Sequence, residues 1–455
     1  SARSEESLVA GAQKMADWLE GHGAANGSAP LLPDLVYSLG VRRNHHQYRL
    51  TVVSDSTANL AAELRTVGTE DVSPTVRIDF APAPEHPLKV GFVMSGQGPQ
   101  WWGMGRELME AEPVFREALL ECAVAIDKHA NFSLMEELGR DEESTRLQRT
   151  EIGQPAIFAM QYALSQLWKS WGVMPEAIAC HSVGEIAAAC VAGILSVEEA
   201  SRVIVLRSQV MHECARGEGT MLAVGINEED ASDLISRHDP ENISIAAFNG
   251  PRSLTLSGPK EALEKVQAEL DSKEVFARFV RVDHPFHHAM MQPAADAMES
   301  ALADLKPQEE TVPFYSTVSG ERCNGVDCTA DHWARGIRQP VQFVSAVNSL
   351  ADHGIDVWLE ISAHPALAMS INECLAERET KAPVVSSARR EREHGSALDA
   401  ALELHRQGVV LDFNGMTPSR NLVQLPAYAW NKERWWNEGA EHRSGRLGNG
   451  GRGLL

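Results

Sequence analysis

Ser182 is the residue of this chain whose setting most favours nucleophilic chemistry. It lies in the run 177–193, AIACHSVGEIAAACVAG, where a short apolar stretch precedes the serine and an alanine-rich stretch follows it. A serine at a sharp strand-to-helix turn projects its hydroxyl group outward, and the N-terminus of the following helix offers backbone N–H groups to a developing oxyanion. The pattern therefore predicts a nucleophile elbow with Ser182 as the nucleophile.

The cysteine two positions before this serine departs from the usual elbow. Cys180 stands where glycine is common, because the turn crowds that residue. Cysteine is small, so the turn can survive. The same short pattern also fits a buried strand, loop and helix with an incidental serine, and the rest of the chain has to decide between these two interpretations.

Three histidines are candidates for the base that a nucleophilic serine needs, because imidazole is well suited to accept a proton near neutral pH. His284, His287 and His288 follow the last strand of a predicted small subdomain, in the run 283–288, DHPFHH. A chain that leaves a fixed strand can place these side chains beside the elbow. The alternative is a solvated turn.

An arginine lies in the middle of an apolar helix face. The predicted helix 197–214 carries Arg207 within a stripe formed by Ala200, Val203, Ile204, Val210, Met211 and Cys214. A buried guanidinium needs an anionic partner. That partner can be an acidic residue of the protein, or the carboxylate of a substrate held through two parallel hydrogen bonds.

A glycine-rich turn follows another predicted strand. The run 95–101, SGQGPQW, comes directly after the strand 88–94. It lacks the Lys-Ser/Thr ending of a P-loop and the glycine spacing of a dinucleotide-binding fold. We expect its backbone N–H groups to stabilise an oxyanion rather than to bind a nucleotide.

The composition is typical of a soluble globular protein with two or more domains: 455 residues, of which 44% are hydrophobic and 23% charged. The formal charge of −22 argues against nucleic acid and anionic membranes as partners. The first residues, SARSEESL, contain no signal-peptide core, and no apolar run approaches the length of a membrane span. We therefore expect a cytoplasmic protein that acts on small molecules.

The cysteines predict neither a disulfide framework nor a metal site. Seven are scattered along the chain, at positions 122, 180, 190, 214, 323, 328 and 374. An odd, scattered set fits a reducing compartment. Cys323 and Cys328 are close in sequence, but no second Cys or His pair with zinc-finger spacing accompanies them, so we expect no metal ligands.

The order of elements predicts an α/β fold. A parallel-sheet, hydrolase-like core would carry an inserted ferredoxin-like subdomain, behind a small N-terminal α/β domain. The N-terminal domain spans 1–87 and ends in a proline-rich run, APAPEHP, and the core spans 88–405. One core helix is predicted from Gln154 to Trp171, with Pro155 in its first turn. The core sheet is predicted from four strands, 88–94, 177–179, 355–361 and 382–386.

The inserted subdomain spans 218–283 and reads strand, helix, strand, strand, helix, strand. After the core, residues 406–438 contain a stretch rich in proline and aromatic residues, LVQLPAYAWNKERWW at 422–436, which is predicted to be an extended strap. The tail 439–455 is rich in glycine and arginine and is predicted to be disordered.

Five short motifs together resemble the acyltransferase domains of modular type I polyketide synthases. They are GQGPQW at 96–101, CHSVGE at 180–185, LRS at 206–208, FNGP at 248–251 and HPFH at 284–287, and they follow the order and spacing of that family. Residues 33–80 resemble the linker between ketosynthase and acyltransferase. The run LPAYAWNKERWW resembles the linker that follows the acyltransferase, so the resemblance covers residues 30–437.

The resemblance assigns roles to the matching positions. It implies that Ser182 is acylated, and that His287 is the general base and later the general acid. The backbone N–H groups of Gln97 and Val183 would form the oxyanion hole. Arg207 would bind the free carboxylate of an extender unit.

The resemblance also implies a substrate pocket and an orienting group for the histidine. The implied pocket residues are Gln154, His181, His284, Phe286 and Asn249. Gln154 and Asn249 are equally compatible with a structural role. A backbone carbonyl near the run 362–365, SAHP, would orient His287.

The implied reaction is a transfer in two steps. Ser182 takes an acyl group from coenzyme A, and the phosphopantetheine thiol of an acyl carrier protein then takes it from the serine. The coenzyme A thioester is thus a substrate, and no cofactor is bound permanently. The carrier protein and an adjacent ketosynthase would be the partners, in the biosynthesis of a polyketide antibiotic.

The residues after the serine and in the histidine motif bear on the extender unit. Family members with Val or Ile after the serine and a HAFH-type motif mostly select malonyl, so Val183 and the run 284–287 predict malonyl-CoA. Pro285 replaces the usual alanine, and this change could admit an α-substituent such as that of methylmalonyl. One methyl group is worth only about 1–3 kcal/mol of discrimination.

Two other functions fit parts of the sequence. A serine hydrolase shares the elbow, but its reaction does not explain the arginine at position 207. A scaffold could dock neighbouring synthase domains through the strap and the N-terminal unit while the elbow is inactive. The joint presence of Ser182, His287 and Arg207 argues against the scaffold.

Overall fold

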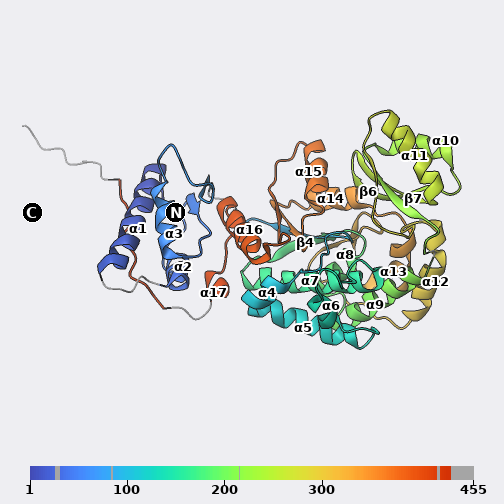
Figure 1. Cartoon of the computed structure of the whole chain (residues 1–455), viewed down its shortest axis with the longest axis horizontal. Helices are drawn as coiled ribbons and strands as arrows, with labels where there is room; N and C mark the ends of the chain where they lie inside the picture. The colour runs from blue at the N-terminus through green and yellow to red at the C-terminus, as the bar shows by residue number, and fades with distance from the viewer. Residues whose placement is uncertain (26–30, 83–85, 215, 418–420, 432–455) are drawn as a thin grey trace, which may run out of the picture. The chain divides into compact units, whose positions relative to one another are not determined.

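The computed structural model describes residues 1–25, 31–82, 86–214, 216–417 and 421–431 (Figure 1). The chain forms two compact units, one of Ser1–Ile78 with Leu422–Leu455 and one of Asp79–Asn421. The predicted tail 439–455 and the last part of the predicted strap, 432–438, lie outside the described residues. None of the described helices is long and apolar enough to cross a membrane.

The smaller unit is built mainly from three helices. They are α1 (Glu5–Ala25), α2 (Leu32–Val41) and α3 (Thr57–Arg65), accompanied by strand β1 (Tyr48–Thr51), which pairs with β2 (Arg77–Phe80). Ser56 caps α3, because its hydroxyl group accepts the backbone N–H of Asn59 at 3.2 Å. Apolar side chains of all three helices meet in one core, in which Ala16 and Leu35 are fully buried.

The described part of the strap, 421–431, returns to this smaller unit. The backbone N–H of Val423 donates to the Ser38 hydroxyl group at 2.8 Å, and Leu425 packs against the helical core. The N–H of Arg3 donates to the Tyr428 hydroxyl group at 2.9 Å. The strap has neither helix nor strand over these residues, as its sequence predicts.

The larger unit is organised around a six-stranded sheet of order β10-β9-β4-β3-β11-β12. Its strands are β3 (Val90–Met94), β4 (Pro175–Cys180), β9 (Phe314–Tyr315), β10 (Arg322–Cys323), β11 (Val357–Ile361) and β12 (Val384–Ser386). All neighbours are parallel except β10 and β9 at one edge. The predicted parallel α/β core is therefore confirmed.

Helices cover both faces of this sheet, because alternate strand residues point to opposite sides. Phe92 and Ile178 belong to a large apolar cluster with α5 (Pro113–Asp127), α7 (Thr150–Ser170), α8 (Gly184–Val191) and α9 (Val197–Glu213). Val93 and Ala179 belong to a second cluster with α14 (Phe343–Asp352) and α15 (Ala368–Glu377). The other helices are α4 (Arg106–Ala111), α6 (Leu134–Gly139), α12 (Gln292–Ala301), α13 (Ala330–Arg338), α16 (Glu393–Gln407) and α17 (Phe413–Met416), with short 3-10 turns at Ala289–Met291 and Gly325–Asp327.

One helix boundary differs from the prediction. Helix α7 begins at Thr150, four residues before Gln154, so Pro155 lies inside the helix rather than in its first turn. The prediction followed apolar spacing, which Thr150 and Gly153 do not carry, although both are buried. Gly153 lies so close to the Leu147 carbonyl that a Cβ atom there would be 2.5 Å from the oxygen.

The inserted subdomain has the predicted βαββαβ order. It consists of β5 (Thr220–Val224), α10 (Glu228–His238), β6 (Ser244–Gly250), β7 (Ser253–Gly258), α11 (Lys260–Ser272) and β8 (Ala277–Phe279). The strands form one antiparallel sheet of order β6-β7-β5-β8, and α10 and α11 lie side by side against it (Figure 1). This is the ferredoxin-like arrangement, which is therefore confirmed. Its last strand leads the chain to the run 283–288.

Candidate active site

Ser182 occupies a sharp turn between β4 and α8. Its φ angle is 47°, in the left-handed region that few non-glycine residues adopt. The turn is held from both sides, because the His181 N–H donates to the Met94 carbonyl at 2.9 Å and the Gly184 N–H donates to the His181 carbonyl at 3.0 Å. The backbone geometry is that of a nucleophile elbow.

The cysteine before the elbow fits the fold. Cys180 ends β4, pairs with Met94 of β3, and is fully buried, with its Sγ atom 3.6 Å from the Tyr315 carbonyl. Burial holds the pKa of this thiol well above its ordinary value, so it stays protonated. The side chain is part of the apolar core behind the turn rather than of the reacting groups.

His287 is the histidine that the structure brings to the serine. Its Nε2 atom lies 2.8 Å from Ser182 Oγ, and its Nδ1 atom lies 2.9 Å from the backbone carbonyl of Gln339. That carbonyl can accept only an N–H, so the proton is on Nδ1 and Nε2 is free to accept the serine proton. The prediction of an orienting carbonyl near 362–365 is wrong, since the carbonyl belongs to the segment between α13 and α14.

The surroundings of His287 favour its neutral form. Burial, and after it the positive charge of Arg207, together lower its pKa to about 3. The imidazole is therefore unprotonated at neutral pH and available as a base. His288, the neighbouring candidate, instead places Nε2 at 3.0 Å from the Asn242 carbonyl and accepts the Met290 N–H on Nδ1.

Arg207 is buried at the same place. One of its terminal nitrogens donates to Ser182 Oγ at 3.2 Å and the other donates to the Gln154 side-chain oxygen at 2.6 Å. Within the described part of the chain, no carboxylate lies within ion-pairing distance of this guanidinium. Burial lowers the pKa of Arg207 to about 10, which leaves it charged at neutral pH. An internal salt bridge, one of the two interpretations of this arginine, is thus not formed.

Two backbone N–H groups that are predicted to form the oxyanion hole have no protein acceptor among the described residues. Val183 precedes α8 and Gln97 lies in the glycine-rich turn after β3. Over the described ranges, neither N–H donates a hydrogen bond to another protein group. Val183 is buried and Gln97 half-buried, and a ligand oxygen is a natural acceptor for N–H groups left without a protein partner.

The remaining polar positions fall into two groups. Gln154 lies in the site, since it accepts from Arg207 and its amide nitrogen is 3.4 Å from the Gln97 side-chain oxygen. His181 and Asn249 bond to each other, with His181 Nε2 at 2.8 Å from Asn249 Oδ1. This bond joins the elbow to strand β6 of the inserted subdomain.

His284 and Phe286 lie beside one another, with parallel rings whose centroids are 5.2 Å apart. His284 Nε2 is 3.0 Å from the His212 carbonyl at the end of α9. Among the residues that the structure describes, no hydrogen bond joins either ring to Ser182 or Arg207. The hydrogen bond of His284 thus runs to the end of α9 rather than to the serine.

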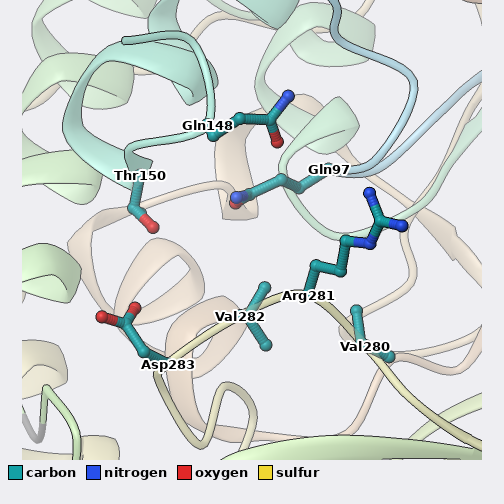
Figure 2. Close-up of a pocket in the computed structure, with 7 residues that line it drawn as sticks. All are labelled: Gln97, Gln148, Thr150, Val280, Arg281, Val282 and Asp283. Atoms are coloured by element: carbon teal, nitrogen blue, oxygen red, sulfur yellow. The ribbon is translucent and has the colours of Figure 1, made fainter.

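A hollow of about 330 Å³ opens next to Gln97, between the core and the chain leaving the inserted subdomain. Figure 2 shows Gln97, Gln148 and Thr150 on one side and the segment Val280 to Asp283 along the other. Sequence reasoning missed all of these except Gln97. The exposed Arg281 was the available signal, because it is a cation on the segment that leads to the histidines.

Two family descriptions match the chain. "Acyl transferase domain" matches residues 91–410, and "RhiE-like, KS-MAT linker domain" matches residues 1–71. The first covers more than half of the chain and includes every residue of the site described above.

Curated relatives are much longer than this chain. Polyketide synthase GfsB of Streptomyces halstedii is 34% identical over 96% of this chain and 8% of its own length. Erythronolide synthase EryA2 of Saccharopolyspora erythraea is 32% identical over 96% of this chain and 12% of its own length. The chain thus spans about a tenth of the length of these relatives.

Solved structures show the same fold. The acyltransferase domain from module 8 of the salinomycin polyketide synthase is 31% identical, with a TM-score of 0.83 over 91% of this chain and 96% of that one. The malonyl CoA-acyl carrier protein transacylase from Clostridium perfringens is 26% identical, with a TM-score of 0.63 over 70% of this chain and 97% of that one. The chain therefore belongs to the acyl transferase domain family of modular polyketide synthases, with a ketosynthase–acyltransferase linker domain ahead of that domain.

Proposed function

We propose that this chain loads a malonyl extender unit from coenzyme A onto the phosphopantetheine thiol of an acyl carrier protein, through an acyl-enzyme on Ser182. The observation that carries the proposal is the buried guanidinium of Arg207, 3.2 Å from Ser182 Oγ and without a described carboxylate partner. A cation buried in this way favours a ligand that brings its own carboxylate. Malonyl thioesters carry one at a fixed distance from the reacting carbonyl carbon.

The first half-reaction uses groups that are already in place. His287 Nε2 accepts the proton of Ser182 while Oγ bonds to the thioester carbonyl carbon, and the N–H groups of Val183 and Gln97 stabilise the oxyanion. The carbon–sulfur bond then breaks, and His287 returns the proton to the coenzyme A thiolate. Gln339 keeps the imidazole in the required tautomer.

The second half-reaction reverses these proton movements. His287 accepts the proton of the phosphopantetheine thiol, the sulfur attacks the acyl-serine, and the proton returns to Ser182 Oγ as the ester bond breaks. Atoms and charges balance without a permanently bound cofactor. The curated relatives are much longer polyketide synthases, and a linker domain of the KS-MAT type precedes the acyl transferase domain in this chain. Both findings support a carrier protein and an adjacent ketosynthase as partners in polyketide biosynthesis.

Two further observations support the proposal. Val183 and the run 284–287 match the pattern typical of malonyl-selecting members. The unusual Pro285 fits the fold, because it packs against Gly219, where a Cβ atom would lie only 2.8 Å from the proline Cβ. The seven cysteines are all free thiols, which fits a reducing cytoplasm.

Intact-protein mass spectrometry after brief incubation with malonyl-, methylmalonyl- or acetyl-CoA tests the proposal. We expect a malonyl adduct on the native chain and none on Ser182→Ala. Arg207→Ala should lose malonyl labelling by about 30-fold or more, because removing one partner of a buried charge pair costs about 2–5 kcal/mol. It should favour the acetyl adduct. Arg202→Ala is the matched control, since Arg202 is on the same helix but pairs with Asp304 at the surface.

Each other outcome changes a specific part of the proposal. Preferential methylmalonyl labelling would overturn the malonyl assignment alone. Rapid loss of the adduct to water, without a carrier protein, would support a hydrolase. No adduct from any of these thioesters would support the scaffold interpretation.

The hollow beside Gln97 leads us to assign a role to Arg281. We propose that coenzyme A or phosphopantetheine enters there and that Arg281 contacts its phosphate groups; among the described residues this arginine forms no ion pair. Arg281→Ala should raise the KM for malonyl-CoA about 2- to 5-fold, the effect of one exposed charge contact. Arg278→Ala is the control, because Arg278 lies over the Phe276 ring and does not line the hollow. An equal effect of both variants would show a general charge effect and contradict the assignment.

A further inference from the structure

Cys323, Cys328 and His332 form a cluster away from the reacting groups. One ligand atom from each lies within 4.8 Å of the other two. Cys323 ends β10, Cys328 follows a 3-10 turn, and His332 lies in the first turn of α13. Cys328 and His332 are buried and Cys323 is half-buried. In the sequence, no His pair with zinc-finger spacing accompanies the two cysteines. The fold brings one histidine, His332, next to them.

The spacing of the two sulfur atoms fits a shared metal ion. They are 3.8 Å apart. A tetrahedral zinc ion with Zn–S bonds of about 2.3 Å holds two thiolate sulfurs about 3.8 Å apart. A disulfide would need a separation of about 2.05 Å. The pair is therefore placed as two metal ligands are, and it is not closed as a disulfide.

His332 holds a carboxylate on one ring nitrogen, as metal-binding histidines usually do. Its Nε2 atom lies 2.9 Å from a carboxylate oxygen of Glu185, so Nδ1 is the nitrogen left for a ligand. Histidine ligands of zinc commonly hold a carboxylate on their other nitrogen, which sets the tautomer and raises the basicity of the ligand. Glu185 is itself fixed, because it accepts from Ser316 and from the hydroxyl and backbone N–H of Thr317.

We propose that Cys323, Cys328 and His332 bind a zinc ion through two thiolates and one imidazole Nδ1. Binding releases the two thiol protons to solvent, and water takes the fourth position on the side of the half-buried Cys323. Soft thiolate ligands with one imidazole suit zinc better than magnesium or calcium. This site goes beyond the acyltransferase reaction and does not depend on it.

The site has a structural connection to the elbow. Glu185 belongs to the first turn of α8, three residues after Ser182, and its carboxylate reaches His332. A metal ion on Nδ1 would hold the ring against that carboxylate and so stabilise the start of α8. The ion would position the elbow from behind without touching the substrate.

Metal content and spectroscopy test the site directly. The reduced chain is equilibrated with Zn²⁺, desalted, and examined by native mass spectrometry, with Co²⁺ as a spectroscopic substitute. We expect one Zn²⁺ per chain, a thiolate-to-cobalt charge-transfer band, and a rise in Tm on zinc addition. Cys323→Ser, at a half-buried position, and Cys328→Ser should each weaken Zn²⁺ binding more than about 100-fold, because they remove direct ligands rather than outer partners.

Two comparisons keep the test decisive. Cys214→Ser removes a half-buried cysteine outside the cluster, near the Met290 carbonyl, and should retain full zinc binding. The proposal is wrong if the reduced native chain retains no zinc, or if the Cys323 and Cys328 variants bind it as the native chain does. It is also wrong if the purified chain carries a Cys323–Cys328 disulfide and still binds no zinc after reduction.

Discussion

Ser182 and His287 both have positive φ angles, 47° and 57°. Glycine adopts such angles with less strain, so the backbone at these two reacting residues is strained. Five described non-glycine residues have a positive φ angle, and Ser182 and His287 are the two of them that share the 2.8 Å hydrogen bond. Their backbone is held by the surrounding structure, which places the hydroxyl and the imidazole before any substrate arrives.

The pH dependence of acylation follows from the two perturbed groups. His287, with a pKa of about 3, must be unprotonated, and Arg207, with a pKa of about 10, must be protonated. The rate with malonyl-CoA should therefore be flat from about pH 5 to about pH 9, fall above about pH 10, and fall at the acid side only near the His287 pKa. Rapid-quench measurement of the acyl-enzyme checks this.

The Arg207→Ala variant gives the control for that profile. Removing the cation removes the second cause of the low His287 pKa, so that pKa should rise. With acetyl-CoA, the acid limb of this variant should lie at higher pH than that of the native chain. An acid limb near pH 6.5 in the native chain would contradict a buried, neutral His287.

At the scale of elements, the close approach of α8 to β3 sets the elbow. A Cβ atom on Gly184 would lie 2.7 Å from the Met94 carbonyl oxygen and 2.5 Å from that of Ser95. Both are backbone atoms that cannot move aside cheaply. Glycine at the start of α8 therefore allows the helix to begin directly behind the serine, with its N–H groups toward the site.

Gly184→Ala should displace α8 and damage both stability and catalysis. We expect a loss of about 1–3 kcal/mol in the free energy of unfolding, as for other overpacked positions, and at least about tenfold slower acylation. Urea denaturation and intact-mass labelling measure the two effects. Gly336→Ala is the control: it lies within α13, and a Cβ atom there would meet only Val318 Cγ2 at 3.5 Å. Equal behaviour of the two variants would contradict the close-packing argument.

In the molecule as a whole, residues 1–78 and the described strap residues 422–431 belong to one unit. The described strap residues bond to the N-terminal helices: Lys14 Nζ donates to the Ala427 carbonyl at 2.9 Å, and the Ser7 hydroxyl donates to Asn431 at 3.0 Å. The acyl transferase core is thus inserted between two segments of the smaller unit in sequence. Stability of the smaller unit should depend on the strap, and that of the core should not.

The double variant Leu425→Ala/Tyr428→Ala tests this division. It removes the apolar contact and the Arg3 hydrogen bond, so amide exchange in α1 and α2 should quicken by about tenfold, while α7 should be unchanged. Leu422→Ala is the control, because Leu422 is exposed. Faster exchange in α7, or no change in α1 and α2, would contradict the prediction.

Features that depend on neighbours along the chain could be read from the amino-acid sequence. The elbow at Ser182 follows from small residues between a strand and a helix. The βαββαβ order of the inserted subdomain follows from hydrophobic patterns that change between the two-residue period of strands and the 3.6-residue period of helices. The apolar stripe around Arg207 showed that its charge would be buried. Each of these is a local property, because hydrophobic periodicity and turn chemistry act over a few residues.

Contacts between distant residues became visible in the folded chain alone. It showed that the Gln339 carbonyl, rather than one near 362–365, orients His287, and that no described carboxylate pairs with Arg207. It also brought His332 to the cysteine pair. Such contacts join elements far apart in the chain, and they depend on how helices pack on the sheet. Because the hydrophobic effect is non-directional, the spacing of apolar residues along the chain does not specify which distant side chains meet.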